Sequence, residues 1–298
     1  MRFAVWGLTG TLEVEDASSG SRARRVLWRW LAALDAACNR FDPASELCQL
    51  NARPDVEVRV SPVLEQAVAV ALAAAAATAG ACDPTVEPAL VALGYDADFD
   101  VVTSRSPRDA RAAVPAAGPG AVELDRERHT VRLAPGCRLD LGATAKALAC
   151  DVVADELAAD GGVLVEIGGD VAVRGRGPTG PWVVGVDDGV TRPNVAPRVF
   201  AHGGGIATSS SARRAWRLAH GRVHHIIDPR TGAPVAGPYA SATVAAPTCW
   251  QANAFSTAAL VWGGDAPARL ASAGWAARLV RAEGLVESVA GWPPEASP

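Results

Sequence analysis

The stretch "LDLGATAKALACD", residues 139–151, decides the fold that we expect for this chain. Asp140 ends a predicted strand, Gly142 makes a turn, and a helix is predicted over roughly residues 143–159. The first N–H groups of a helix are unpaired and lie at the positive end of its dipole, so such a junction suits an anion. Lys146 follows one turn inside the helix. The stretch therefore predicts a place for an anionic ligand with a cation close by.

Lys146 is the only lysine in the chain, because the other 27 of its 28 Lys and Arg residues are arginine. Lysine is a compact point charge on a flexible stem, whereas arginine is a wide planar fork. The chain uses arginine at every other basic position, so the lysine at this one indicates a role for a small cationic group. A salt bridge between Asp140 and Lys146 at the start of the helix explains the lysine about equally well.

On both sides of this stretch, strands cluster into meanders and helices come singly. Predicted helices cover residues 21–40, 61–80 (capped by Ser61 and buried along its alanine-rich run), 143–159, 253–261 and 267–274. Predicted strands cover 3–15 (broken at Gly7 and Gly10), 121–135 (a hairpin), 163–175, 182–188, 223–228 and 240–247. This order is typical of an α+β protein rather than of regular βαβ units. We expect one domain over residues 1–298, with room for two lobes and a flexible tail at 293–298.

Composition excludes several classes of protein. The net charge of −4 and the isoelectric point near 5.8 argue against a nucleic-acid partner. The six cysteines show no CxxC spacing, so we expect reduced thiols. The longest apolar run, from Ala67, is rich in alanine and shorter than the ~20 residues that span a bilayer. We therefore expect a cytoplasmic protein without membrane insertion.

Asn253 and Thr257 in "CWQANAFSTAAL" are i,i+4 neighbours on one helix face. Both offer oxygen atoms of the kind that Mg²⁺ prefers. Taken alone, a solvated polar stripe is the better explanation. The glycine-rich segments "EIGGD" (166–170) and "HGGGIATSSS" (202–211) allow a close approach of backbone to phosphate, and bulges or tight turns explain them equally well.

The segment "HHIIDPRTG" (224–232) contains a candidate general base. His224 and His225 are adjacent in a predicted strand, so their side chains point to opposite faces and only one can serve a given site. A histidine with a pKa near ~6.5 suits proton transfer at neutral pH. Asp228 lies in a turn sequence and can simply form that turn. A GxSxG elbow is absent, which disfavours a hydrolase of the Ser-His-Asp type.

Together and in this order, the segments resemble the ApbE family of flavin transferases, with wording closest to actinobacterial members. The similar segments are "WGLTGT", "NRFDPASELCQLN" (39–51), "GACDPTVEPAL" (80–90), "LDLGATAKALACD", "VEIGGDVAVRG", "GIATSSSARRAW" (205–216), "HHIIDPRTG" and "TVAAPTCWQANAFSTAALV" (243–261). The resemblance spans residues 6–287. It implies an α+β fold related to the T-fold, with antiparallel sheets and flanking helices around an FAD cleft.

The resemblance also implies a reaction and a set of residues. The family uses Mg²⁺ to transfer FMN from FAD to a Thr or Ser hydroxyl of an acceptor protein, and it releases AMP. The family's positions fall on the following residues: FAD on Phe41, Ala81, Cys82, Asp83, Asp140, Lys146 and Ile226; metal on Asn253, Thr257 and the backbone oxygen of Ala143; catalysis on His225 as the base, with Asp228 holding the local turn.

One departure from the family concerns the metal. The family commonly has aspartate where this chain has Asn253, which keeps an oxygen ligand but lacks its charge. We therefore expect Mg²⁺ to bind weakly unless the FAD pyrophosphate supplies negative oxygens. Two alternatives follow: an FAD pyrophosphatase that yields FMN and AMP, and a non-catalytic FAD-binding protein.

Overall fold

The computed structural model describes residues 1–191 and 197–293, so the predicted tail at 293–298 lies almost wholly outside the described residues. The chain forms two compact units. Unit 1 contains Met1–Leu31, Lys146–Ala212 and Gly237–Pro298, and unit 2 contains Ala32–Ala145 and Arg213–Ala236. Both units combine helices with antiparallel strands, which confirms the predicted α+β class. The helices do not come singly as expected, because several follow one another without a strand between them.

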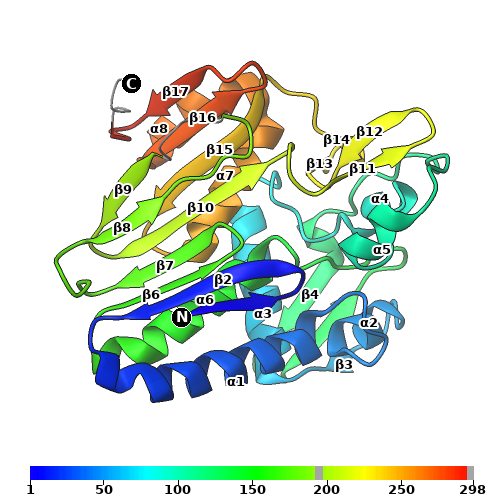
Figure 1. The fold of residues 1–298 in the computed structure, drawn as a ribbon. Helices are drawn as coiled ribbons and strands as arrows, with labels where there is room; N and C mark the ends of the chain where they lie inside the picture. Colours follow the sequence, from blue (N-terminus) through cyan, green and yellow to red (C-terminus); the bar gives the residue numbers. More distant parts are fainter. Residues whose placement is uncertain (192–196, 294–298) are drawn as a thin grey trace. The chain divides into compact units, whose positions relative to one another are not determined.

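Unit 1 is built on an antiparallel sheet of eight strands (Figure 1). In spatial order these are β1 (Arg2–Val5), β2 (Leu8–Val14), β6 (Val163–Ile167), β7 (Asp170–Arg174), β10 (Gly204–Ser210), β15 (Tyr239–Ala246), β16 (Ala277–Arg281) and β17 (Val286–Val289). Two more strands, β8 (Trp182–Gly185) and β9 (Arg198–Ala201), pair with each other. Side chains of this pair, including Trp182 and Val184, form one apolar cluster with Val173 and Ile206 of the large sheet.

Glycines set two features of this sheet. Gly168 and Gly169 have positive φ and form the turn between β6 and β7, so the segment predicted as strand over 163–175 is a hairpin in which Asp170 begins the second strand. The expected break at Gly10 is wrong. Gly10 lies inside β2, and a Cβ there would fall 2.4 Å from the Phe3 ring, so the glycine allows close packing rather than a turn.

Among the described residues, the helices of unit 1 are α1 (Gly20–Cys38) and α6 (Thr144–Leu157), which both cross a unit boundary, and α7 (Cys249–Trp262) and α8 (Ala266–Ala273). Helix α7 begins four residues before its predicted start at 253, because Thr248 caps it by accepting the N–H of Gln251. Short 3₁₀ turns cover Ala17–Ser19, Pro119–Ala121, Ala158–Asp160 and Gly263–Asp265.

Asp151, the last residue of the opening stretch, holds the start of α7. Its carboxylate accepts the N–H groups of Cys249 and Trp250, each at 3.0 Å, and binds Arg174 at 3.0 Å. Burial raises the pKa of Asp151, while these three bonds oppose the rise. Because the first N–H groups of a helix otherwise lack partners, Asp151 connects α6 to the first turn of α7.

Unit 2 contains short helices and small sheets. The helices are α2 (Glu46–Asn51), α3 (Pro62–Ala77), α4 (Glu87–Ala92) and α5 (Phe99–Ser104). The strands are β3 (Val58–Arg59), β4 (Val122–Asp125) and β5 (Thr130–Leu133), which form one sheet in the order β3-β5-β4, and the pairs β11 (Ala215–Leu218) with β12 (Gly221–His224) and β13 (Ile227–Asp228) with β14 (Ala233–Pro234).

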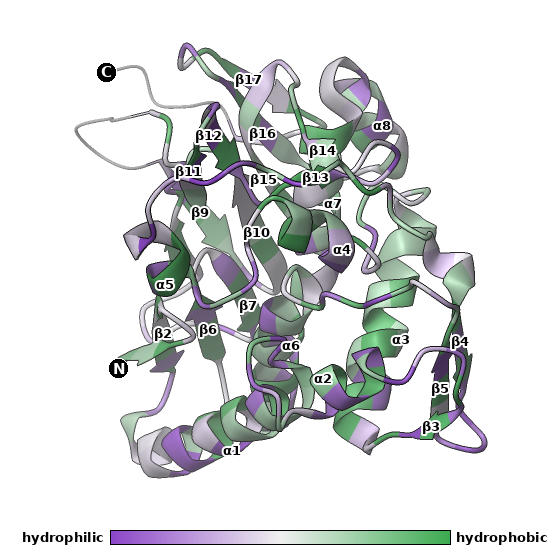
Figure 2. Cartoon of the chain, turned by 90° about the vertical axis from the view of Figure 1, so that its right-hand side faces the viewer, coloured by the Kyte–Doolittle hydropathy of each residue, from purple (hydrophilic) through white to green (hydrophobic). Residues whose placement is uncertain are grey.

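Helix α3 is the alanine-rich segment predicted to be a buried helix, and Figure 2 shows it largely apolar. Ser61 caps it as predicted, and it ends at Ala77, three residues before the expected stop at Gly80.

Within the described part of the chain, no helix combines the length and apolar character that a membrane crossing requires. All six cysteines are free, as predicted.

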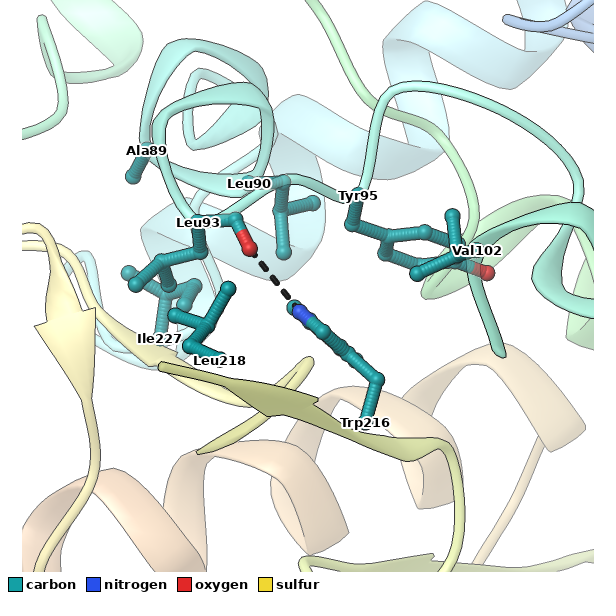
Figure 3. Packing of buried hydrophobic residues seen from close by; sticks show 8 residues of the cluster. All are labelled: Ala89, Leu90, Leu93, Tyr95, Val102, Trp216, Leu218 and Ile227. Atoms are coloured by element: carbon teal, nitrogen blue, oxygen red, sulfur yellow. Dashed lines mark hydrogen bonds between the residues drawn. The ribbon is translucent and has the colours of Figure 1, made fainter. Parts of the chain in front are cut away.

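A cluster of apolar side chains anchors the β11–β12 hairpin in unit 2 (Figure 3). Trp216 of β11 donates its indole N–H to the carbonyl oxygen of Leu93 at 2.8 Å. Leu218 of β11 and Ile227 of β13 belong to the same cluster, and Phe41 packs against it. The histidine segment between β12 and β13 is therefore held from both sides by buried side chains.

A prediction follows for the contact between β10 and α7. A Cβ on Gly205 would lie 2.3 Å from the backbone of Cys249, so Gly205→Ala must push the start of α7 away from the sheet. We expect the free energy of unfolding to fall by about 1–3 kcal/mol, as in overpacked cores. Denaturant unfolding measures this change. Gly203→Ala is the control, because its Cβ meets only one atom at 4.0 Å; equal losses in the two variants would contradict the contact.

Candidate functional site

Asp170 lies at the centre of the polar residues that unit 1 brings together. Its Oδ2 atom is 2.7 Å from Lys146 Nζ, and its Oδ1 atom accepts the amide of Asn253 at 2.8 Å. The Asp170 side chain is only 2% exposed, and the strand β7 that it begins lies between β6 and β10. We call Lys146, Asp170 and Asn253 the Asp170 cluster. It joins α6, β7 and α7 through side chains alone.

Asn253 Oδ1 is buried and has no hydrogen-bond partner among the described residues. One turn further along α7, Thr257 Oγ1 lies 3.0 Å from Ser209 Oγ, which also lies 2.8 Å from Ser256 Oγ. An unpartnered buried carbonyl oxygen is costly, and an oxygen-seeking cation would satisfy it. Across residues 1–191 and 197–293, no group of three His, Cys, Asp or Glu side chains could hold a metal. The oxygens of Asn253 and Thr257 are neutral, and oxygen ligands are the kind that a hard cation such as Mg²⁺ accepts.

The alternative of a salt bridge between Asp140 and Lys146 is wrong. Lys146 pairs with Asp170, as described, and Asp140 pairs with Arg40, whose Nε atom lies 2.8 Å from Asp140 Oδ2. Asp140 Oδ1 also accepts the N–H of Gly142 at 2.6 Å, which closes the turn before α6. Ala143, the predicted backbone ligand, directly precedes that helix in unit 2, whereas Asn253 and Thr257 belong to unit 1.

Arg40 organises the predicted flavin positions of unit 2. Its guanidinium lies over the rings of Phe41 and Tyr95, at 4.0 and 4.4 Å from their centroids, and donates to the Tyr95 carbonyl oxygen at 2.9 Å. The same guanidinium binds Asp140, and its Nη2 atom is buried without a partner in the described chain. Aromatic faces attract cations. Arg40 thereby fixes Phe41 and Asp140 relative to each other.

The segment Ala81–Asp83 adjoins the same group through the backbone. The N–H of Asp140 donates to the carbonyl oxygen of Pro84 at 2.8 Å, so the residue after Asp83 pairs directly with Asp140. Asp83 Oδ1 accepts both the N–H and the hydroxyl of Thr85, at 2.8 and 2.7 Å. Unit 2 therefore brings the segment around Asp83 next to Asp140 through a backbone hydrogen bond, and Arg40 connects Asp140 to Phe41.

His224 ends β12, and His225 lies between β12 and β13, so the continuous strand predicted over residues 223–228 is wrong. His224 is engaged at both ring nitrogens, because Nδ1 accepts the N–H of Ile226 at 3.3 Å and Nε2 lies 3.2 Å from the Val235 carbonyl oxygen. These contacts require a neutral ring with its proton on Nε2. Burial lowers the pKa of His224, the bond to Val235 opposes this, and Arg222 adds to it. His224 is thus a structural residue, and His225 stays the predicted base.

Asp228 forms the turn that its sequence suggested. Its carboxylate accepts the backbone N–H, Nε and Nη2 of Arg230 at 3.0, 2.9 and 2.8 Å, and its backbone oxygen accepts the N–H of Gly232 at 2.9 Å. The bonds from Arg230 hold the pKa of Asp228 below its usual value, so the carboxyl is ionised at neutral pH. Its oxygens serve the turn, and it shapes the segment that follows His225 and Ile226.

Sequence reasoning assigned no site role to Asp170, Arg40 or Asp151. Each lies inside a segment that was singled out: "EIGGD", "NRFDP" and the end of "LDLGATAKALACD". In each case another residue type drew the attention, namely the glycines, the phenylalanine and the lysine. A charged residue that the chain buries beside a predicted ligand is the signal that could have identified them.

An eight-stranded antiparallel sheet with helices gives this chain a fold that known proteins share. A family model described as the ApbE family matches residues 6–279. The FAD:protein FMN transferase of Salmonella typhimurium is 30% identical over 278 residues, which cover 91% of this chain and 77% of that protein. The Escherichia coli FAD:protein FMN transferase is 28% identical over the same shares.

Solved structures of ApbE proteins have a similar fold. The ApbE protein of Thermotoga maritima has a TM-score of 0.82 and 26% identity, and the match covers 97% of this chain and 96% of that one. The Pseudomonas stutzeri flavinyl transferase ApbE has a TM-score of 0.80 and 26% identity, covering 97% and 93%. The fold is that of the flavin transferases. The chain belongs to the ApbE family, which confirms the resemblance drawn from its motifs.

A prediction about pH follows from His224. Its pKa in the folded protein lies below the ordinary 6.5, so the unfolded chain binds more protons below that pH. The contribution of neutral His224 to the free energy of unfolding is fully present above pH 6.5. It is lost as the pH falls through the pKa of His224 in the folded protein. We expect His224→Gln, whose amide can still accept and donate a hydrogen bond, to flatten the loss of unfolding free energy as the pH falls below 6.5. Urea unfolding across this range measures it, with the exposed His202→Gln as control; parallel wild-type and His224→Gln curves would refute the assignment.

Proposed function

We propose that this protein transfers FMN from FAD to a Thr or Ser hydroxyl of an acceptor protein, with Mg²⁺ and with release of AMP. Family membership supports the reaction, since relatives that carry this activity in their names match 91% of the chain. The observation in the chain itself that supports it most is the unpartnered, buried oxygen of Asn253 beside Thr257, which suits a cation that accompanies a pyrophosphate.

The reaction is a phosphoryl transfer. The acceptor oxygen attacks the phosphorus of the FMN half of FAD, the bond from that phosphorus to the bridging oxygen breaks, and AMP leaves with the bridging oxygen. In such reactions, positioning and charge neutralisation supply most of the rate. Bound Mg²⁺ would neutralise charge on the pyrophosphate. We assign Asn253, Thr257 and the Ala143 carbonyl oxygen to hold it.

The roles of the other residues follow from their chemistry. His225 takes the proton from the attacking hydroxyl. Asp228 holds the turn after it through Arg230. Phe41, stacked on Arg40, offers an aromatic face for the flavin ring. Lys146 supplies one ammonium for the anionic part of FAD.

Further flavin contacts are assigned to the positions that the family resemblance indicates: Ala81, Cys82, Asp83, Asp140 and Ile226. Of these, Asp140 and the segment around Asp83 already share one hydrogen-bonded neighbourhood, and Ile226 is buried beside the His224 ring. Such a prearranged set lowers the entropy cost of binding a large ligand.

One assay tests the proposal. The protein is incubated with FAD, Mg²⁺ and a candidate acceptor, and AMP, free FMN and protein-bound flavin are followed. Covalent flavin on the acceptor with an equal amount of AMP supports the transfer. Free FMN with AMP identifies a pyrophosphatase, and FAD that binds without turnover identifies a flavin-binding protein; either result would replace the proposal.

His225→Ala is predicted to bind FAD as the wild type does and to lose transfer by about 10²–10⁴-fold, because the general base is gone. Stopped-time assays of bound flavin and a flavin fluorescence titration separate the two effects. His224→Gln is the matched control, since it changes the adjacent ring while both of its backbone contacts can persist. Similar losses of rate in the two variants would place the base elsewhere.

Lys146→Arg is predicted to weaken FAD binding and transfer although the charge is kept. Lysine uses one donor on Asp170 Oδ2, and the amide of Asn253 occupies Oδ1. A guanidinium prefers to bind both oxygens of a carboxylate and would compete for Oδ1. Calorimetric titration of FAD measures the loss. Wild-type affinity and rate in the arginine variant would show that the single lysine has no functional meaning.

A further inference from the structure

Asp170 is a buried carboxylate that binds one predicted site residue with each oxygen atom. Oδ1 accepts the amide of Asn253 at 2.8 Å, and Oδ2 lies 2.7 Å from the ammonium of Lys146. The side chain is 2% exposed, and its backbone lies in β7 between two neighbouring strands, so its position is fixed by the sheet. A carboxylate buried in this way is retained only if its partners satisfy it.

The side-chain amide of Asn253 has two orientations, which differ by exchange of its oxygen and its nitrogen. An ionised carboxylate only accepts hydrogen bonds, so Asp170 requires the NH₂ group to face it and Oδ1 to face away. In that orientation Oδ1 is buried without a hydrogen-bond partner in the described chain. An unpartnered buried oxygen is unfavourable by itself, so the bond to Asp170 is what holds the amide in this orientation.

We infer that Asp170 is a positioning residue, which presents the oxygen of Asn253 to a divalent cation and holds the Lys146 ammonium next to it. The inference rests on the proposed function for the identity of the ligand, a cation bound together with the FAD pyrophosphate. Asp170 itself touches neither. It acts through Asn253 and Lys146, as hydrogen-bonded partners behind metal ligands commonly do.

Asp170 also decides which charge residue 253 can carry. Taken alone, an aspartate at 253 would hold a cation more tightly than an asparagine. Next to Asp170 it would place a second carboxylate within hydrogen-bond distance of the first, and two buried like charges oppose each other. The pair therefore accommodates one carboxylate and one amide, and the carboxylate can move to position 253 only if position 170 gives it up.

Four proteins test this: the wild type, Asp170→Asn, Asn253→Asp and the double exchange Asp170→Asn/Asn253→Asp. In the exchanged pair, the amide of residue 170 can donate to the carboxylate of residue 253 and accept from Lys146. Two quantities are measured for each protein, namely the unfolding midpoint without ligand and the calorimetric affinity for FAD in the presence of Mg²⁺.

We expect Asn253→Asp to lower the unfolding midpoint by roughly 5–10 °C, because it leaves an uncompensated buried charge. Asp170→Asn should weaken binding of FAD with Mg²⁺ by about 10–100-fold, because the amide of Asn253 is no longer oriented. The double exchange should recover most of both losses. Additive losses, with no recovery in the double exchange, would overturn the inference, since residues that act as a pair couple in such a cycle.

Asp188→Asn is the matched control for the loss of a buried carboxylate in unit 1. Asp188 binds the buried Arg278 and the hydroxyl of Thr191. This variant should lower the unfolding midpoint and leave the affinity for FAD with Mg²⁺ unchanged. A loss of affinity equal to that of Asp170→Asn would show general destabilisation and overturn the inference.

The two hypotheses fail separately. A wild type that binds FAD and Mg²⁺ but transfers no flavin refutes the proposed function, while coupling in the ligand-free unfolding midpoints still decides whether residues 170 and 253 form a pair. A wild type that transfers flavin, with independent effects of the two substitutions, refutes the inference alone. If Asn253→Asp fails to fold, a folded double exchange with restored affinity supports the inference, and an unfolded one contradicts it.

Discussion

The polar part of unit 1 depends on one constraint: a single buried carboxylate, that of Asp170, must satisfy two donors from two different helices. A charge removed from water is tolerated only when each of its oxygens has a partner. Lys146 of α6 and Asn253 of α7 supply them. Because β7 is a central strand, neither helix can shift along the sheet without breaking a bond to Asp170. The same bonds that stabilise the packing also fix the directions of the two side chains.

A second set of contacts fixes where α7 begins and how close it lies to the sheet. Asp151 binds its first N–H groups, Arg174 binds Asp151, and Gly205 lets the backbone of the helix approach β10 to a distance that no side chain would allow. The stretch of residues 139–151 thus contributes two contacts. Lys146 reaches Asp170, and Asp151 reaches α7, with the helical turn between them setting the spacing.

How much the sequence could predict depends on how local the deciding contact is. Ser61 capping α3 and the hairpin at 121–135 involve residues close in the chain, and the structure confirms both. The sequence prediction for α7 starts at Asn253, four residues too late, although the cap at Thr248 is also a local feature. The cationic partner of each aspartate, in contrast, is decided by contacts between residues far apart in the chain.

Asp140 lies six positions from Lys146 in the sequence, yet it binds Arg40, about a hundred positions away. Pairing of this kind is decided by tertiary packing, which periodicity and spacing do not contain. The motifs of the sequence predict the family, which the comparisons confirm, while the roles that the family assigns to single residues stay predictions. The residues that hold those motifs in place, Asp170, Arg40 and Asp151, required the structure.

The charges of the Asp170 cluster bear directly on the proposed reaction. Lys146 and Asp170 carry opposite charges and form a pair at 2.7 Å, and Asn253 is neutral, so the cluster offers a cation oxygen atoms but no net negative charge. Mg²⁺ gives up its hydration water reluctantly, and neutral oxygens compensate for that poorly. Under the proposed function, the missing charge is that of the FAD pyrophosphate. Cation and FAD then raise each other's affinity by the same factor, as linkage requires. Under the proposed function, a cluster without net charge therefore needs FAD to complete the metal site, and it would bind a cation poorly when FAD is not present.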